Sequence, residues 1–393
     1  MISFARYATL LARPELKTAI VASLIGRLPI GIAGLAILLL AQSASGSFAH
    51  AGAAAALYVA GLAFVAPVLG RRIDRSGPRV VLLACALAYP AALCAFVVSV
   101  QQAASAPLSL ALAALAGAFF PPITVCMRSF FRRQLADDAL LAAAFSLESV
   151  LIEIIFILGP LLVALLVAFV SAAAAVFFAA ACAFAGTLLF LRSPALANWR
   201  VEPRAHASLF GPLGERGFAP LLAVVLGYSA AFGLVEIGVT AYAAEAGSPA
   251  LAGVLLGLMS VGSALGGLAY GGRSWGAALV RQFAAVLVVM GAGIAPLALV
   301  RNECLFALLG TIAGIVMAPA LIIQALLVAK TASPGHLTEA FTWSTTALLA
   351  GIGVGLAAGG WLVERWASPA TFVAAALATL SAGALALALR TRG

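Results

Sequence analysis

The chain has 393 residues, of which 64% are hydrophobic and only 9% are charged, and its formal net charge is +9. A water-soluble fold is excluded, because soluble domains carry about one-quarter charged residues. The basic residues lie between apolar runs rather than on one face, so the positive charge does not indicate a nucleic-acid partner.

The apolar runs predict membrane-spanning helices. Backbone polar groups must be paired in hydrocarbon, so the chain crosses the bilayer either as helices or as a closed barrel. The runs last about 20 residues or more, whereas barrel strands would give alternating segments of about ten. The first six predicted spans cover residues 17–41, 49–70, 78–100, 107–128, 140–168 and 171–192. The second six cover residues 218–244, 249–272, 277–299, 303–330, 338–363 and 368–390.

A polar stretch divides these twelve spans into two sets. Residues 193–217 contain three prolines and no sustained apolar period, which is typical of a linker. We therefore expect an all-α membrane protein with two pseudo-symmetric six-helix bundles, at residues 1–192 and 218–393.

The first predicted span contains an arginine. Arg27 lies about ten residues into the span, or about 15 Å at 1.5 Å per residue, which is near the midplane. An ionisable side chain inside a span is costly and is a candidate functional group.

The loop after the second span contains candidate gating residues. Gly70 is expected to allow close helix approach, Gly77 to permit a tight turn, and the arginines to pair with Asp74 or with lipid phosphate. An alternative interpretation is a basic anchor at an anionic lipid surface. The loop reads Gly70-Arg71-Arg72-Ile73-Asp74-Arg75-Ser76-Gly77-Pro78-Arg79.

The fifth span contains two glutamates, Glu148 and Glu153. Five residues on a helix turn by about 140°, so the two side chains cannot point into one cavity. We expect one to pair with Arg27 and the other to titrate. Glu153 is the preferred proton site and substrate contact, with Arg27 tuning it or holding an anionic substrate. The alternative is a static pair between Arg27 and a glutamate that only fixes helix packing.

Other polar and aromatic residues are weaker candidates. Arg128 ends the fourth span beside two further arginines and is interpreted as an interfacial charge. Glu236 in the seventh span either lines the cavity entrance or is a wet residue near the outer interface. The remaining candidates for a cavity lining, each of a type that is more often packing than binding, are Phe119, Tyr228, Gln324 and Trp343. Such a lining favours an amphipathic or weakly polar organic solute.

The basic residues predict the orientation. If the N-terminus is cytoplasmic, 19 of the 22 Lys and Arg residues lie on the cytoplasmic side, and only Arg301 and Arg365 face outward. This asymmetry follows the positive-inside rule. It predicts that both termini lie in the cytoplasm.

The two sets of spans show an internal repeat. A shift of 201 residues places Gly61 on Gly262 and Gly70 on Gly271. A shift of 196 places Gly159 on Gly355, and a shift of 197 places Pro122 on Pro319. Parallel repeats predict halves related by an axis along the membrane normal, with a site between them near the midplane.

Two motifs carry a family resemblance. The loop at residues 70–79 resembles the Gly-x-x-x-Asp-Arg-x-Gly-x-Arg/Lys signature of the major facilitator superfamily. The resemblance implies that Asp74 holds the cytoplasmic gate shut by docking near the start of span eleven, around Leu337 and Thr338. Gly159-Pro160 resembles the Gly-Pro core of the span-five motif of proton-coupled exporters, although Val163-Ala164 replaces an expected glycine pair. A simple proline kink explains Gly159-Pro160 equally well.

These features predict a secondary transporter that most resembles short bacterial drug and metabolite exporters, and the resemblance implies a proton-driven protein of the bacterial inner membrane. A transporter of sugars, amino acids or other polar metabolites is the alternative within the class, and a non-transporting membrane sensor is the alternative outside it. We expect no catalytic residues, no metal and no cofactor, because no nucleotide-binding loop or ligand spacing occurs. The expected partners are a small-molecule substrate, protons and membrane lipids, and the chain is expected to act as a monomer.

Overall fold

The computed structural model describes residues 10, 12, 14–103, 105–135, 137–193, 196, 211–215, 217–273, 275–333 and 337–389. Every regular element in these residues is a helix. The N-terminal helices are α2 (Pro14–Arg27), α3 (Pro29–Ser45), α4 (Phe48–Ser76), α5 (Pro78–Gln101), α6 (Ala106–Ala118), α7 (Ile123–Gln134), α8 (Asp138–Phe169) and α9 (Ala172–Arg192). The C-terminal helices are α11 (Phe218–Glu245), α12 (Leu251–Gly271), α13 (Leu279–Ile294), α14 (Glu303–Gly314), α15 (Met317–Thr331) and α16 (Leu337–Leu387), with short 3₁₀ turns at Gly211–Gly214 and Ala295–Leu299.

Prolines divide two of the predicted spans. Pro29 begins α3 directly after α2, and Pro121-Pro122 separate α6 from α7. Proline lacks the N–H that would continue the helical hydrogen bonding, so each span is built from two helical pieces. α14 and α15 likewise form one span with a break at residues 315–316.

The described residues contain 11 helical segments long and apolar enough to cross a membrane, rather than the 12 predicted. The difference arises in α16, whose 51 residues would be about 76 Å long as one straight helix. A bilayer core is about 30 Å thick. The segment bends at Trp366 and Ala367, whose backbone angles are not helical, so α16 contains two helices.

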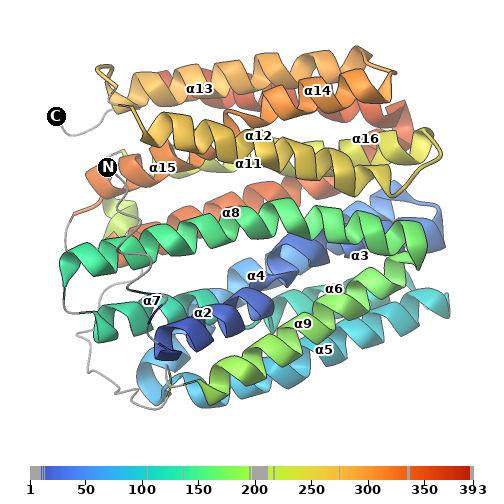
Figure 1. The fold of residues 1–393 in the computed structure, drawn as a ribbon. Coiled ribbons are helices and arrows are strands. Elements are labelled where there is room, and N and C mark those ends of the chain that lie inside the picture. Colours follow the sequence, from blue (N-terminus) through green and yellow to red (C-terminus); the bar gives the residue numbers. More distant parts are fainter. Residues whose placement is uncertain are drawn as a thin grey trace.

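The N-terminal and C-terminal helices have largely separate cores. Tyr89 and Phe96 are completely buried among the N-terminal helices, whereas Phe218, Phe283 and Phe306 are completely buried among the C-terminal helices. In Figure 1 the N-terminal helices, in blue to green, form the lower part of the molecule. The C-terminal helices, in yellow to red, form the upper part.

The two sets of helices meet closely at one end. A Cβ added at Gly52 of α4 would collide with the carbonyl oxygen of Leu356 in α16, and one at Gly253 of α12 with that of Pro160 in α8. A Cβ added at Gly360 of α16 would likewise collide with the carbonyl oxygen of Phe48 in α4. We call these backbone contacts the outer seam, because they lie near loops 46–47 and 246–250, which the sequence analysis places outside.

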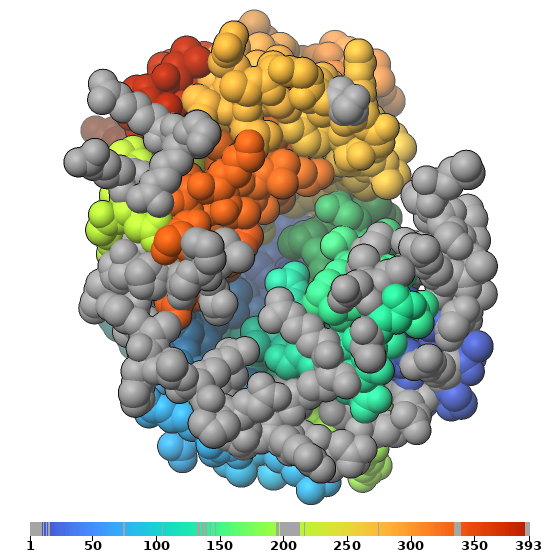
Figure 2. Space-filling view, turned by 90° about the vertical axis from the view of Figure 1, so that its left-hand side faces the viewer, coloured from blue at the N-terminus to red at the C-terminus, as the bar shows by residue number. Residues whose placement is uncertain are grey.

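The opposite end is open. Figure 2 shows this face hollowed between the orange C-terminal segment and the teal to green N-terminal helices, with blue helices deeper in the hollow. A Cβ at Gly70 or Gly271 would meet no atom within 4 Å. The close helix approach expected at Gly70 is therefore not made in this conformation, because the helices diverge here.

Candidate functional site

A buried ion pair lies where the first span breaks. Arg27, the last residue of α2, is 1% exposed, and its Nη1 lies 3.1 Å from Oε1 of Glu148, which is 3% exposed. The Arg27 guanidinium also donates to the backbone oxygen and the hydroxyl of Ser23, each at 3.2 Å. Three of its five N–H groups are therefore satisfied within the protein.

A second arginine contacts the same carboxylate. The Nε of Arg128 in α7 lies 3.4 Å from Oε2 of Glu148, and the Arg128 side chain is 61% exposed. We call Arg27, Arg128 and Glu148 the arginine–glutamate cluster. It joins α2, α7 and α8, which belong to the first, fourth and fifth predicted spans.

The faces of α8 explain why Arg27 pairs with Glu148 rather than Glu153. Gly159 packs against Gly31 of α3, and Glu148, eleven residues earlier, lies within about 20° of the same face. Glu153 instead lies within about 20° of Pro160 and Ala164, which contact Gly253 of α12.

Glu153 therefore lies on the face of α8 that packs against the C-terminal helices. It is about two turns from the outer seam, on the side where the helices diverge. The Glu153 side chain is half-buried, and it makes no hydrogen bond or ion pair with the residues that the structure describes.

Glu236 of α11 lies at the contact between the first and seventh spans. Its Oε1 is 3.4 Å from the position that a Cβ at Gly34 of α3 would occupy. The half-buried carboxylate has no hydrogen-bond partner among the described residues. Glu236 therefore lies between the N-terminal and C-terminal helices, and its predicted role at the cavity entrance stays a prediction.

A neutral hydrogen-bonded triad lies within the C-terminal helices. The buried hydroxyl of Tyr228 donates to Oε1 of Gln324, and Nε2 of Gln324 donates to the hydroxyl of Ser344 at 2.7 Å. The Tyr228 ring packs edge-on against Phe232 and Phe283. We call Tyr228, Gln324 and Ser344 the neutral triad; it joins α11, α15 and α16.

The neutral triad and the arginine–glutamate cluster occupy repeat-related positions. A shift of 201 residues places Arg27 on Tyr228, and a shift of 196 places Arg128 on Gln324 and Glu148 on Ser344. The surrounding packing repeats too, because Gly26 faces Gly186 as Gly227 faces Ala382. The sequence analysis missed Ser344, although the shift of 196 applied to Glu148 would have found it.

The predicted aromatic lining is mainly packing. Phe119 is half-buried against the N-terminal cores, and its neighbour Phe120 makes an edge-on contact with Tyr89. Trp343 packs partly buried against the C-terminal core.

The gating loop is described only in part. Gly77 ends α4 with a positive φ of 83°, as its predicted turn requires, and Arg75 and Arg79 are exposed. The side chains of Asp74, Leu337 and Thr338 lie outside the described residues, so their predicted docking is not described. Gly159-Pro160 lies where α8 crosses α3 and α12.

A contact between the two sets of helices at the outer end was not predicted. Glu364 of α16 accepts hydrogen bonds from the hydroxyl of Ser47 and from the backbone N–H of Ala49, at 3.0 Å for the latter. Ser47 is the N-cap of α4, so the carboxylate lies at the positive end of that helix. We call this contact the outer latch.

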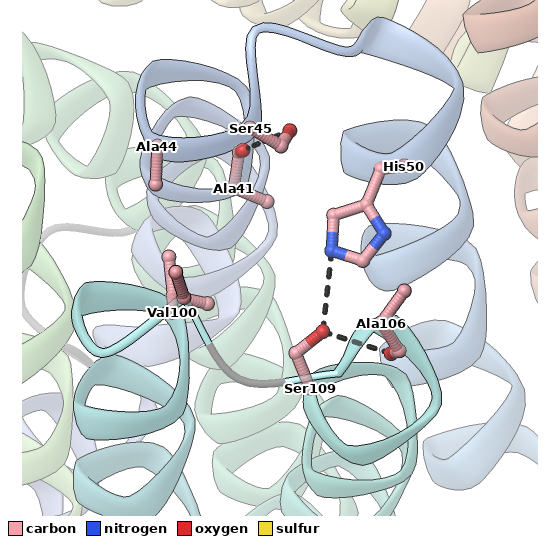
Figure 3. Close-up of a pocket in the computed structure, with 8 residues that line it drawn as sticks. Ala41, Ala44, Ser45, His50, Val100, Ala106 and Ser109 are labelled. Carbon is pink, nitrogen blue, oxygen red and sulfur yellow. Dashed lines mark hydrogen bonds between the residues drawn. The ribbon is translucent and has the colours of Figure 1, made fainter.

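A small cavity lies apart from these sites. It measures about 340 Å³ and lies near the outer end among N-terminal helices alone. Figure 3 shows His50 of α4 pointing toward Ser109 of α6, and their side chains are 3.2 Å apart. This hydrogen bond ties the second span to the fourth. Among the described residues no group of His, Cys, Asp and Glu is suited to hold a metal.

Comparisons with known proteins identify relatives of the chain. A family model described as Major Facilitator Superfamily matches residues 19–300. The fold is similar to that of a mutant of the nucleoside transporter NupG, with a TM-score of 0.75, 15% identity, and coverage of 95% of this chain and 99% of that one. It is also similar to the human organic anion transporter MFSD10, with a TM-score of 0.65, 17% identity, and coverage of 95% and 100%. At these identities the likeness shows the fold alone, and no curated protein sequence matches the chain.

Proposed function

The chain belongs to the major facilitator superfamily, and we propose that it is a secondary active transporter that exports a drug-like or amphipathic organic solute across a bacterial inner membrane. The proposed topology has twelve spans and two bundles, at residues 1–192 and 218–393, joined by a cytoplasmic linker. The non-helical break at Trp366–Ala367 supports counting α16 as two spans. The distribution of Lys and Arg supports placing both termini in the cytoplasm.

One observation carries the proposal of alternating access. The two sets of helices are closed at the outer seam and separated at the opposite, hollowed end (Figure 2). With the proposed topology this conformation is open to the cytoplasm. A transporter of this kind exposes a central site to one side at a time, as halves rock about that site.

We assign proton coupling to Glu153. An ionisable group inside the membrane marks an ion pathway by default. Glu153 has no partner among the described residues and lies on the face of α8 that packs against α12, so the environment of Glu153 would change when the halves move. Because Arg27 and Glu148 form an ion pair, we assign the role of proton carrier to Glu153. Glu236 is the second candidate.

Proton release tests this assignment. Purified protein in weakly buffered detergent is mixed with a panel of organic solutes, and released protons are followed with a pH dye. We expect release from wild type and from Glu303→Gln, which removes an exposed carboxylate in the outer loop region, but not from Glu153→Gln.

Two outcomes would contradict the proposal. A solute that binds wild type without releasing protons would contradict proton coupling. Absence of solute flux in proteoliposomes with an imposed proton gradient, for every solute that binds, would contradict transport and favour a sensor.

A further inference from the structure

We infer that Arg128, which Glu148 holds in place, binds the anionic group of the transported solute. The substrate is then an amphipathic organic anion. This inference names the substrate class of the cavity and therefore rests on the proposed function. The anionic group is a carboxylate, sulfonate or phosphate ester.

The first argument is charge. Arg27 and Glu148 are both almost fully buried and 3.1 Å apart, so they neutralise each other. Arg128 then adds a second positive charge to the same carboxylate at 3.4 Å, and the three residues together carry a net charge of +1. A surplus charge on a membrane-spanning segment is costly, and a bound anion would remove the cost.

The second argument is the supply of free hydrogen-bond donors. Only the Nε of Arg128 makes a hydrogen bond to a described residue, and neither terminal nitrogen bonds to any part of the chain that the structure describes. These two nitrogens form the planar fork that binds a carboxylate or phosphate through two parallel bonds. Glu148 holds the other edge of the guanidinium, so the fork is already oriented.

The third argument is location. Arg128 is about six residues, or about 9 Å, from the end of α7 at the open end of the molecule. α7 and α8 belong to the teal to green wall of the hollow in Figure 2. Val125, three residues earlier on the same face of α7, is 47% exposed. A positive group beside an exposed apolar one fits a solute with one charged and one apolar part.

The neutral triad argues against a purely structural role for the charges of the arginine–glutamate cluster. Tyr228, Gln324 and Ser344 tie the repeat-related helices together without any charge. Holding the first, fourth and fifth spans in place therefore does not require two arginines and a glutamate, and the extra positive charge of the N-terminal helices needs another reason.

Three related solutes provide the test. Protein purified in a neutral detergent is titrated with 2-naphthoate, with 2-naphthalenesulfonate, and with the neutral 2-naphthamide, and thermal unfolding is followed by tryptophan fluorescence. We expect the two anions to raise the Tm of wild type and the amide to have little effect. Arg128→Gln is expected to weaken anion binding about tenfold or more, because hydrogen bonds to charged groups are strong.

Two control variants separate this effect from general changes in charge or folding. Arg281→Gln removes an equal charge from an exposed position on α13 and should bind the anions like wild type. Arg128→Lys keeps the charge and should retain part of the affinity. Equal stabilisation by the amide, or full anion binding by Arg128→Gln, would overturn the inference.

Phosphatidylglycerol distinguishes a solute site from a lipid site. If this anionic lipid alone raises the Tm through Arg128 and both naphthalene anions have no effect, the cluster binds a lipid headgroup and the substrate assignment is wrong. Flux is measured separately in proteoliposomes. Transport of neutral solutes alone would overturn the anion site and leave the proposed transport function intact. Arg128-dependent anion binding without any flux would support the anion site and overturn the transport function.

Discussion

The N-terminal helices and the C-terminal helices are tied together by different kinds of side chain. At repeat-related positions, the first set places a carboxylate between two guanidinium groups, and the second places three neutral side chains. Among the described residues, the C-terminal helices form hydrogen bonds with carboxylates only near their ends, at Glu215, Glu245 and Glu364. The difference indicates that helix ties within the membrane can be neutral, which is why we assign the charges of the N-terminal helices to binding.

The largest expected effect comes from removing one member of the buried pair. Arg27→Leu should lower the free energy of unfolding by about 3–5 kcal/mol, because it leaves the carboxylate of Glu148 buried with only an exposed arginine beside it. Thermal or denaturant unfolding in detergent measures this loss. A change below about 1 kcal/mol would mean that the pair is not buried as described, and the comparison with the neutral triad would fail.

A smaller loss is expected when the neutral triad is broken. Gln324→Ala leaves the buried hydroxyls of Tyr228 and Ser344 without their shared partner. An unsatisfied buried polar group costs about 1–3 kcal/mol. The same unfolding assay should therefore rank Gln324→Ala between wild type and Arg27→Leu, and a loss equal to that of Arg27→Leu would remove the distinction between charged and neutral ties.

Neutralising a carboxylate at a helix end should change free energy less than breaking an ion pair within the membrane. Glu364→Gln weakens the outer latch by about 0.3–1 kcal/mol, the typical value for a charge at a helix terminus. This should shift the population toward outward-open forms about two- to fivefold.

Labelling of a cysteine within the outer seam measures that shift. Ala56→Cys, opposite Gly353 in a variant without the native cysteines, should react faster with a membrane-impermeant thiol reagent when Glu364→Gln is present. Glu303→Gln serves as the control. An unchanged labelling rate would show that the latch does not bias the two conformations.

The smallest effect on stability should come from transplanting the neutral triad. The triple variant Arg27→Tyr, Arg128→Gln and Glu148→Ser carries the residues of Tyr228, Gln324 and Ser344 at the repeat-related positions. Replacing a buried ion pair as a unit is often neutral for stability. We expect unfolding close to that of wild type together with loss of anion binding, and a severe loss of stability would show that the charges are needed for packing.

Much of the fold follows from the sequence. The apolar runs, the linker and the loop motif indicate the family, which the match over residues 19–300 confirms. The structure has 11 such segments among the described residues rather than the twelve predicted, and the two counts differ at α16, where Trp366–Ala367 joins two helices by a short bend.

The sites are less predictable than the spans. The 140° between Glu148 and Glu153 follows from helix geometry, but which of them faces Arg27 depends on the packing of Gly159 against Gly31, and the sequence does not reveal that contact. Glu364 lies near a loop and resembles an ordinary exposed charge. Its role depends on the N-terminus of α4, which is more than 300 residues away in the chain.

The outer seam has a consequence for how readily the closed face opens. At Gly52, Gly253 and Gly360 the helices touch through their backbones rather than through interlocking side chains. Beside these glycines, Ile237, Ala252 and Leu356 are buried against the N-terminal core, so opening the outer face exposes them and requires new contacts to replace theirs. A bulky side chain at any of these glycines would act as a wedge and hold the outer face apart.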